Sequence, residues 1–347
     1  MGSRKSLHES INLTEVIDIK SLNVRNDVTE TIVALCKSAI SLVDEISLSG
    51  LGADHRSLAG KNTDGDNQKK LDVIADDLFR NMLKEAGIGF YASEELEHIE
   101  TLNEDGKIGV AIDPLDGSSN IDCNVSIGTI FSVKDINEKD SPEKDFFNLG
   151  NYLAAGYFIY GPQTLFVFSC GQGVLKYILN PKNRRFEIIP GKIEIPRSTN
   201  EYAINGSNYR HWPMPVRNYI DECLDGASGP KNKNFNTRWV ASLVAETHRI
   251  LERGGVFLYP GDDREGYSEG RLRMVYECGP IAFLIEQAKG GATNGTQGIL
   301  ELNSKHLHQR TPFVFGSMEE VESIKKAFDD PKAASSPLFK TRGLFNR

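Results

Sequence analysis

Apolar residues recur at helical spacing in six stretches of the chain. In residues 29–46 they lie three or four positions apart, and Asp27 and Thr29 are candidate caps for the start of this helix. A second amphipathic stretch follows at residues 68–86, and the others lie beyond about Pro196. The predicted helices are residues 29–46, 68–86, 215–224, 238–252, 277–289 and 318–328.

Short runs rich in β-branched and aromatic residues occupy the middle of the chain. Six of them lie between residues 88 and 179, and two more separate the later helices. Strands that are bracketed by helices on both sides indicate stacked sheets and helices, so we predict a layered α/β (α+β) fold. The predicted strands are residues 88–92, 107–112, 126–133, 152–160, 165–169, 174–179, 255–259 and 311–315.

The composition is that of a globular protein, and its net charge argues against one class of partner, nucleic acid. The 347 residues are 39% hydrophobic and 25% charged, and the net charge of −8 argues against nucleic acid as the main partner. No apolar run approaches the roughly 18 residues that a membrane span needs, and the N-terminus lacks a signal-peptide pattern. The five cysteines are scattered without C-x-x-C spacing, which predicts a reducing, cytoplasmic location without disulfides or zinc.

The run at residues 113–119, Asp-Pro-Leu-Asp-Gly-Ser-Ser, carries the most informative chemistry in the chain. It follows a predicted buried strand, and Pro114 has no N–H with which to continue the hydrogen bonds of that strand. We therefore expect Asp113 and Asp116 on a tight turn at the strand's end. Two carboxylates placed this way can converge on one Mg²⁺ ion, with the carbonyl of Leu115 as a further oxygen ligand.

The last three residues of this run suit an anion. Gly117, Ser118 and Ser119 offer backbone N–H groups and hydroxyls of the kind that hold phosphate where a loop meets a helix start. The alternative for the whole run is a polar turn that its Asp side chains stabilise, since Asp, Gly and Ser are all common in turns. Other acidic residues favour the functional interpretation.

Glu94 and Glu95 form one further acidic cluster, at the end of the predicted strand 88–92. Adjacent carboxylates repel each other, so a partly buried pair requires a cation or a raised pKa. A solvated acidic loop is the alternative. Glu277 opens a later predicted helix, where it is either a cap matched to the helix dipole or one more carboxylate for a metal.

Asp66 and Asp72 form another cluster beside a long loop. Residues 49–67 are rich in Gly and Asp and are long enough for a mobile active-site segment. Asp72 lies in the first turn of the following predicted helix, where the helix dipole favours a carboxylate with or without a function. A structural cap is therefore the alternative for Asp72.

Several later residues suit phosphate groups and sugar hydroxyls. Arg271 and Arg273 lie two positions apart on a predicted strand, so both could grip one phosphate, with surface arginines as the alternative. Tyr259 and Asn205 are neutral hydrogen-bonding groups. The sequence has no nucleotide, dinucleotide, zincin or serine-hydrolase motif. With the clustered carboxylates, this pattern predicts metal-assisted phosphate hydrolysis.

Nine motifs follow one another between about residues 66 and 317. They are GDNQKKLDV, SEE, DPLDGSSNID, SIGTIF, AAGY, FLYP, GRLR, YECGP and HQRTPFVFGS. Through these motifs the chain resembles class I fructose-1,6-bisphosphatase, although inositol monophosphatases share the D-P-x-D-G-S core. The resemblance implies an αβαβα sandwich with an N-terminal, allosteric-type domain at 1–198 that carries most metal ligands. A sugar-phosphate-binding domain at 199–335 and a tail at 336–347 would follow.

The resemblance also implies a role for each matching residue. The metal ligands would be Glu94, Asp113, Asp116, Glu277 and the carbonyl of Leu115, with Asp66 and Glu95 near the metals. The residues matching those that activate the attacking water are Asp72 and Glu95. The residues matching the substrate contacts are Asp116, Gly117, Ser118, Ser119, Asn205, Arg238, Tyr259 and Arg271. Of these, the two serines would hold the 1-phosphate, and Asn205, Tyr259 and Arg238 the 6-phosphate.

The implied reaction is hydrolysis of D-fructose 1,6-bisphosphate to D-fructose 6-phosphate and inorganic phosphate, in gluconeogenesis or in the Calvin cycle. Two or three Mg²⁺ ions per subunit would activate the attacking water and neutralise charge, with Mn²⁺ as an alternative ion. Residues 49–67 match the family's dynamic loop. In the family the residue matching Arg238 reaches in from a neighbouring subunit, which implies a homotetramer.

The chain departs from the family's pattern in three places. Arg271 stands where the family usually has Lys, which keeps the charge but changes its geometry. The AMP-binding string is replaced by residues 25–28, and Ile108 and Asp135 stand where a Tyr and an Arg would contact AMP. Asp135 would repel a phosphate, so we expect weak or absent AMP inhibition. The cysteine insertion of the thioredoxin-regulated form is absent, so that control is not expected.

Two alternatives to this function stay open at the level of sequence. One is a bisphosphatase that acts also or mainly on sedoheptulose 1,7-bisphosphate, because one extra hydroxymethylene group changes few contacts. The other belongs to a different class, a catalytically silent relative that binds sugar phosphate as a regulator. The intact acidic set argues against the silent relative, because clustered carboxylates without a function would only repel one another.

Overall fold

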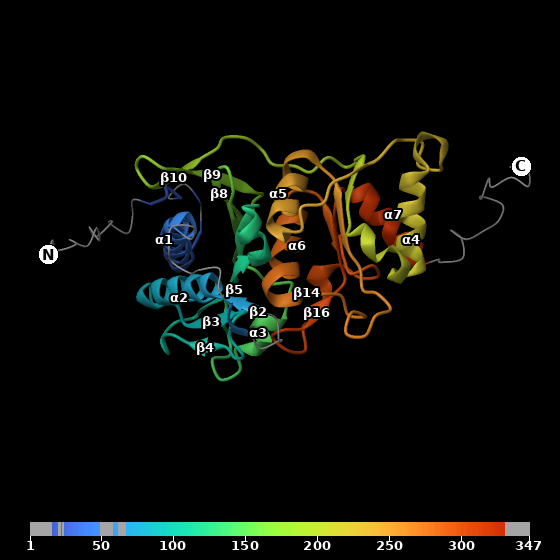
Figure 1. Ribbon diagram of the computed structural model, residues 1–347. Coiled ribbons are helices and arrows are strands. Elements are labelled where there is room, and N and C mark those ends of the chain that lie inside the picture. The colour runs from blue at the N-terminus through green and yellow to red at the C-terminus, as the bar shows by residue number, and fades with distance from the viewer. Residues whose placement is uncertain (1–15, 20–21, 23, 49–57, 62–66, 330–347) are drawn as a thin grey trace, which may run out of the picture.

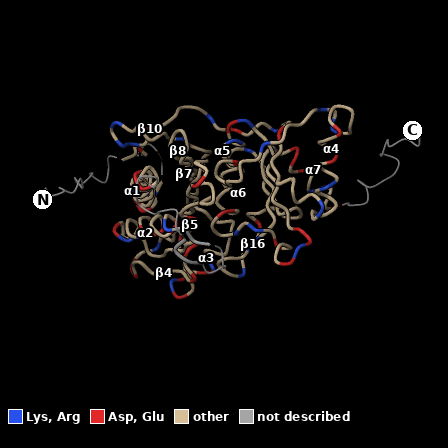
Figure 2. Tube along the Cα trace, in the orientation of Figure 1, with Lys and Arg blue, Asp and Glu red and all other residues tan. Residues whose placement is uncertain are grey.

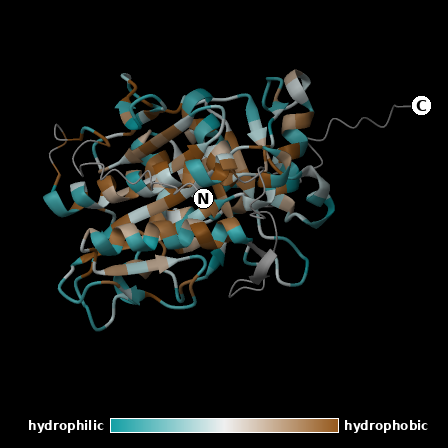
Figure 3. Cartoon of the chain, turned by 60° about the vertical axis from the view of Figure 1, so that its left-hand side comes forward, coloured by the Kyte–Doolittle hydropathy of each residue, from teal (hydrophilic) through white to brown (hydrophobic). Residues whose placement is uncertain are grey.

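Two β-sheets and three layers of helices stack in the order helix, sheet, helix, sheet, helix (Figure 1). The computed structural model describes residues 16–19, 22, 24–48, 58–61 and 67–329. The layering confirms the predicted αβαβα sandwich. Figure 2 shows acidic and basic residues interspersed over the outer loops and helices, and Figure 3 shows the hydrophobic residues concentrated between the layers.

The larger sheet has eight strands in the order β10-β9-β8-β7-β6-β5-β3-β4. Neighbouring strands are antiparallel except β3 and β5, which are parallel. The long central strands are buried along almost their whole length, which explains their near-continuous apolar sequences. The strands are β3 Phe90–Ser93, β4 Glu100–Thr101, β5 Ile108–Asp116, β6 Ile127–Asp135, β7 Ala154–Tyr160, β8 Thr164–Ser169, β9 Leu175–Asn180 and β10 Arg185–Ile188.

Helices α1 (Asn26–Leu48) and α2 (Lys70–Glu85) cover the outer face of this sheet (Figure 1). Both contribute buried residues to the hydrophobic cluster that includes the sheet's outer face. Phe79 of α2 lies 6.5 Å from Phe158 of β7, ring centroid to ring centroid, and Phe158 stacks on Phe166 of β8 at 4.4 Å. The apolar stripes of the two helices therefore pack on one aromatic layer.

The smaller sheet has five strands in the order β12-β11-β13-β17-β15. Helices α5 and α6 lie between the two sheets, and α4 and α7 cover the far face (Figure 1). Residues 279–285 of α6 are all buried, as expected for a helix that is apolar on every side. The elements are β11 Glu201–Ala203, α4 Met214–Leu224, β12 Asn236–Thr237, α5 Leu243–Arg253, β13 Val256–Tyr259, α6 Gly279–Gln287, β15 Gly291–Thr293, β17 Phe313–Gly316 and α7 Met318–Asp329.

The remaining elements are short. Helix α3 (Glu143–Phe147) lies at one end of the larger sheet, and β14 (Leu272–Arg273) pairs with β16 (Arg310–Thr311). Within the predicted loop 49–67, β1 (Leu58–Lys61) pairs antiparallel with β2 (Asn67–Lys69); the rest of that segment, with Asp66, lies outside the described residues. No helix in the described ranges is long and apolar enough to cross a membrane.

Predicted and observed helix boundaries differ, and in two helices the difference has consequences for the site. Residues 238–242 are not helical, and α5 begins only at Leu243, because the hydroxyl of Ser242 accepts the Ala245 N–H and so caps the helix. The helix predicted at 277–289 begins earlier, as the π-helix Met274–Cys278, and continues as α6. Periodicity alone could not separate these segments, because their apolar residues continue through the boundary.

Lys134 on β6 is an unusual charged residue in the core, with only 2% of its surface exposed. Its ammonium group donates to the carbonyl oxygens of Asn148 and, at 3.1 Å, of Asn151, and it lies 4.1 Å above the ring of Tyr152. Burial nevertheless lowers the pKa of Lys134 to about 7. The lysine thereby ties residues 148–152 to the central strand.

We expect Lys134→Met to change how the free energy of unfolding depends on pH. A lysine whose folded-state pKa is about 7 binds fewer protons than the unfolded chain between pH 7 and roughly 10, so wild-type stability rises with pH across that window. The variant should lose this gain, up to about 1.4 kcal/mol per pH unit, in urea unfolding at pH 7 and pH 9. The exposed Lys107→Met is the control, and parallel pH curves for wild type and Lys134→Met would contradict the prediction.

Candidate metal and phosphate site

The site begins where β5 ends, and here the structure corrects the prediction. Pro114 does not end the strand: β5 runs on to Asp116, with a break in its pairing to β6 between Asp113 and Asp116. A bulge accommodates a residue that lacks an N–H, so pairing resumes beyond the proline, with Asp116 opposite Gly128. The N–H of Leu115 turns back to the Asp113 carboxylate at 3.1 Å. The carboxylates therefore lie on a bulged strand end rather than on a free turn.

Asp113, Asp116 and Glu277 meet at one point. Each offers a carboxylate oxygen within 4.8 Å of the other two, and the residues are only 5%, 7% and 5% exposed. Glu277 comes from the π-helix that leads into α6, a type of distortion often found at functional sites. An all-oxygen donor set of this kind fits a hard divalent cation. The structure thus brings together three of the predicted metal ligands.

The electrostatics of this cluster also favour a cation. Burial, followed by repulsion from Glu94, Asp116 and Glu277, raises the pKa of Asp113 well above its usual value. Burial and repulsion from Glu94 raise the pKa of Glu277 to about 8. Burial and mutual repulsion thus disfavour the charged forms of these carboxyls, and a bound cation would favour the charged forms.

Glu94 repels the carboxylates of this cluster, and it pairs with Arg273, a contact that the motifs did not predict. A nitrogen of the Arg273 guanidinium lies 2.6 Å from its carboxylate, and both side chains are largely buried. Arg271, by contrast, is exposed and stacks on Tyr267, 4.9 Å from the ring centroid. Strand β14 covers only residues 272–273, so the two arginines, expected to grip one phosphate together, lie in different surroundings.

Asp116 is held from the opposite side by the start of α5. One of its carboxylate oxygens accepts the Ser242 hydroxyl and the Val244 N–H, each at 2.9 Å. Gly128 permits this approach, since a Cβ at that position would lie 2.6 Å from the Val244 side chain. The sequence prediction missed Ser242 because it placed this residue inside a helix; the available signal was a serine, a preferred N-cap residue, directly before the apolar pair Leu243 and Val244.

Asp76 is a second missed residue. It is buried on α2 and accepts hydrogen bonds from the hydroxyls of Tyr91, at 2.8 Å, and Ser93, at 2.5 Å. Burial raises its pKa, and the two hydroxyls oppose that shift. These bonds anchor the end of β3, directly before Glu94 and Glu95, to α2. Asp76 thus links the helix that carries Asp72 to the strand that carries the glutamate pair.

The candidate catalytic pair comes from these two elements. Asp72 lies in the first turn of α2 and is 4% exposed, whereas Glu95 follows β3 and is partly exposed. The backbone N–H of Glu95 donates to the hydroxyl of Ser93 at 3.2 Å. Asp66, the third acidic residue expected here, lies outside the described residues.

The predicted phosphate turn follows the carboxylates without a gap. Gly117 has φ of 76°, a left-handed conformation that glycine adopts without steric cost, and it caps the 3-10 helix Ser118–Cys123. Ser118 is partly exposed and Ser119 is exposed. The turn therefore presents its serines toward solvent immediately beside the buried oxygen ligands.

The residues expected to contact the sugar and its 6-phosphate come from the second half of the chain. Burial raises the pKa of Tyr259, the charge of Arg271 lowers it, and the charge of Glu277 raises it. Asn205 caps the short helix Gly206–His211 by accepting the Ser207 N–H at 3.2 Å. Arg238 is exposed and lies 3.6 Å from Glu201, so its described contact is outside the carboxylate cluster.

The layered sandwich and its buried cluster of carboxylate oxygens are those expected of a metal-dependent sugar phosphatase. Family models described as fructose-1-6-bisphosphatase, N-terminal domain and C-terminal domain, match residues 13–189 and 195–329. The chain belongs to the class 1 fructose-1,6-bisphosphatase family. The resemblance inferred from the motifs is therefore confirmed, and the chain is a phosphatase of a family that uses a metal cofactor.

Individual relatives match most of the chain. A class 1 fructose-1,6-bisphosphatase of Cereibacter sphaeroides is 55% identical over 308 residues, covering 88% of this chain and 92% of the relative. One from Rhodobacter capsulatus is 50% identical over 330 residues, covering 95% and 99%. The crystal structure of the Leishmania major fructose-1,6-bisphosphatase in holo form matches with a TM-score of 0.83 at 35% identity, covering 90% of this chain and 97% of that one.

We expect Asp113→Asn to stabilise the metal-free protein. A buried carboxyl with a raised pKa keeps a proton that the unfolded chain has lost above about pH 4, so its contribution to stability falls as the pH rises. The amide removes that penalty and keeps an acceptor for the Leu115 N–H. In EDTA the gain should reach about 1–3 kcal/mol at pH 8 and shrink at pH 5, as measured by urea unfolding. The exposed Asp105→Asn should show no gain; a loss of stability in Asp113→Asn at pH 8 would contradict the prediction.

Proposed function

We propose that this chain hydrolyses D-fructose 1,6-bisphosphate to D-fructose 6-phosphate and inorganic phosphate. One observation carries the proposal: three buried carboxylates offer oxygens within 4.8 Å of one another, and two of them, Asp113 and Asp116, come directly before the serine turn at residues 117–119. A cation and a phosphate group would meet at this point. The relatives are class 1 fructose-1,6-bisphosphatases, and this supports fructose 1,6-bisphosphate as the substrate.

We infer that the metal cofactor is Mg²⁺, with two or three ions per subunit and Mn²⁺ as an alternative. The donor set supports this choice because every proposed ligand is an oxygen. Bound Mg²⁺ would supply a water of lowered pKa and positive charge near the phosphoryl oxygens. The residues that would hold the ions are Glu94, Asp113, Asp116, Glu277, the carbonyl of Leu115 and, near them, Asp66.

The proposed proton acceptors for the attacking water are Glu95 and Asp72. A carboxylate acts as a general base when it lies within hydrogen-bond reach of the water. The contacts of Asp76 with Ser93 and Tyr91 support this assignment, because they tie the two elements that carry the pair. Fixing both elements would keep the acceptors in place during proton transfer.

The proposed substrate contacts divide between the two halves of the chain. The N–H groups and hydroxyls of Ser118 and Ser119 would bind the 1-phosphate beside Gly117, and Asp116 would contact the sugar. Tyr259, Arg271, Asn205 and Arg238 would bind the sugar and the 6-phosphate. The exposure of Arg238, 47% for its side chain, supports a contact across subunits in the proposed homotetramer.

The substrate preference is tested with two bisphosphates. The relatives' names favour the fructose ester, so kcat/KM for fructose 1,6-bisphosphate should exceed that for sedoheptulose 1,7-bisphosphate. The reverse order would favour the alternative enzyme. Family membership and the intact carboxylate set argue against a catalytically silent relative.

Loss of the metal or base group should abolish turnover. We expect Asp113→Ala and Glu95→Gln each to lower kcat for Mg²⁺-dependent phosphate release by at least about 100-fold, because one removes a proposed ligand and the other a proposed base. Glu97→Gln, an exposed neighbour, is the matched control and should retain activity. Undiminished release by either of the first two variants would refute the assignment.

AMP should inhibit weakly or not at all. The Arg25 guanidinium pairs with Asp27 and with Asp135, at 2.5 and 2.6 Å, so the cation at this position already has two carboxylate partners. A phosphate approaching it would meet both negative charges. We expect an inhibition constant above about 1 mM in a phosphate-release assay at saturating Mg²⁺. A value well below that would contradict the prediction.

A further inference from the structure

Residues 238–242 connect β12 to α5 and reach the carboxylate cluster at their C-terminal end. Arg238 begins the segment, and Ser242 ends it with its hydroxyl on the Asp116 carboxylate. Between them Ala241 has φ of 60°, a left-handed conformation that residues with a Cβ rarely adopt. A backbone of this kind persists only where surrounding contacts hold it.

One set of contacts holds the segment against the phosphate turn. The side-chain amide of Asn120, in the short helix that follows the turn, donates to the Ala241 carbonyl at 3.2 Å. A Cβ on Gly117 would lie 3.2 Å from the Cβ of Ser242, so the segment passes close to the turn itself. A shift of residues 240–242 would therefore move the groups that orient Asp116.

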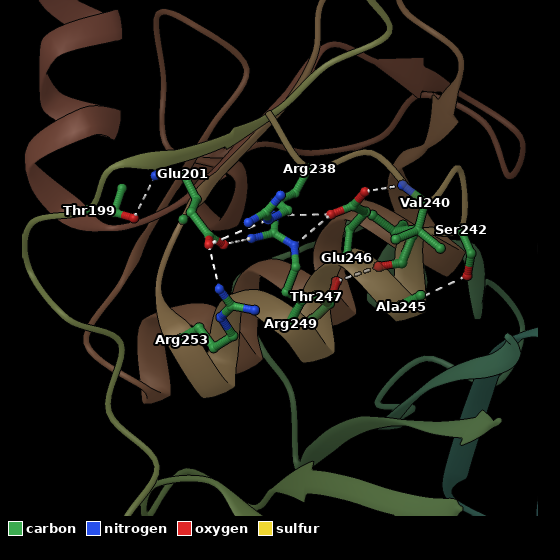
Figure 4. A network of polar contacts seen from close by, with 12 residues as sticks. Thr199, Glu201, Arg238, Val240, Ser242, Ala245, Glu246, Thr247, Arg249 and Arg253 are labelled. Atoms are coloured by element: carbon green, nitrogen blue, oxygen red, sulfur yellow. Dashed lines mark hydrogen bonds and ion pairs between the residues drawn. The ribbon is translucent and has the colours of Figure 1, made fainter. Parts of the chain in front are cut away.

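Glu246 holds the segment from the other side. Its side chain is fully buried in the first turn of α5 and turns back over the helix N-terminus (Figure 4). One carboxylate oxygen accepts the Val240 N–H at 2.6 Å, and the other accepts two N–H groups of Arg249 at 3.0 and 3.2 Å. Both oxygens are therefore used, and one of them fixes the backbone directly before the strained Ala241.

The charge of Glu246 is balanced within a larger network. Arg249 also donates to Glu201 at 2.9 Å, and Glu201 in addition pairs with Arg253 at 2.6 Å and lies 3.6 Å from Arg238 (Figure 4). Three guanidinium groups thus surround two buried carboxylates. A buried charge with this many hydrogen-bonded partners is costly to displace, so the network is a rigid support.

We propose that Glu246 is a positioning residue for the metal site: by holding the Val240 N–H it fixes the strained segment, so that Ser242 and the start of α5 orient the Asp116 carboxylate. The inference rests on the proposed role of Asp116 as a metal ligand. Groups that hydrogen-bond to a ligating carboxylate set its orientation and hence the metal affinity. Glu246 acts on Asp116 through Ser242 and contacts neither metal nor substrate.

The test measures metal binding rather than turnover. Isothermal titration of the full chain with Mn²⁺ should give about 10-fold weaker binding for Glu246→Leu, which is similar in size but cannot accept a hydrogen bond. Glu246→Gln keeps one acceptor and should lie between this variant and wild type. Glu252→Gln, on the exposed side of the same helix and paired with Lys176, is the matched control and should bind as wild type does.

A double-mutant cycle separates positioning from general destabilisation. If Glu246 acts through Ser242, then Ser242→Ala and Glu246→Leu together should weaken Mn²⁺ binding by about 10-fold, as each does alone, rather than by about 100-fold. Multiplicative effects, or binding by Glu246→Leu equal to that of wild type, overturn the inference. Should Glu246→Leu fail to fold, the same cycle with the near-isosteric Glu246→Gln decides. If the wild-type protein binds no Mn²⁺, the proposed metal site is wrong. If the wild-type protein binds Mn²⁺ but Glu246→Leu binds it equally well, only the proposed role of Glu246 is wrong.

Discussion

Repulsion among buried carboxylates is the interaction that the surrounding elements of this structure must offset. Asp113, Asp116 and Glu277 lie within 4.8 Å of one another at no more than 7% exposure, with Glu94 close enough to raise two of their pKa values. Such a group is unfavourable unless opposing charge or N–H donors meet it. Arg273 and the start of α5 supply part of that compensation, and the all-oxygen geometry leaves the remainder to a metal ion.

The layered fold supplies the rigidity that this concentration of charge requires. Asp113 and Asp116 come from the larger sheet, Glu277 from the π-helix between the sheets, and the donors to Asp116 from the start of α5. The larger sheet and the helix layer between the sheets therefore each contribute one side of the site, which exists only when these two layers are stacked. The network around Glu246 extends the support into the smaller sheet, so that metal ligands and proposed substrate contacts share one framework.

Local patterns predicted most helices and strands because burial imposes a period of 3.6 or 2 residues. These local patterns failed where contacts with residues distant in sequence outweigh a residue's own secondary-structure preference. Pro114 was predicted to end the strand, yet β5 continues past it because a bulge in its pairing with β6 accommodates the proline. Residues 238–242 were predicted as helix, yet Ser242 caps α5, and hydrogen bonds to the Glu246 carboxylate and from the Asn120 amide hold a non-helical path. Short strands such as β11 and β15, with three residues each, are too brief for any period to register.

The sequence by itself determined the family, the layered fold class and the acidic motifs, because the ligand types and their local spacing are written in contiguous runs. Only the tertiary structure decided which carboxylates meet, that Arg273 faces Glu94 while Arg271 faces Tyr267, and that Ser242, Asp76 and Glu246 support the site. The physical reason is that these contacts join residues up to 179 positions apart, as in Arg273 and Glu94, and depend on how whole layers pack. No local pattern encodes that packing.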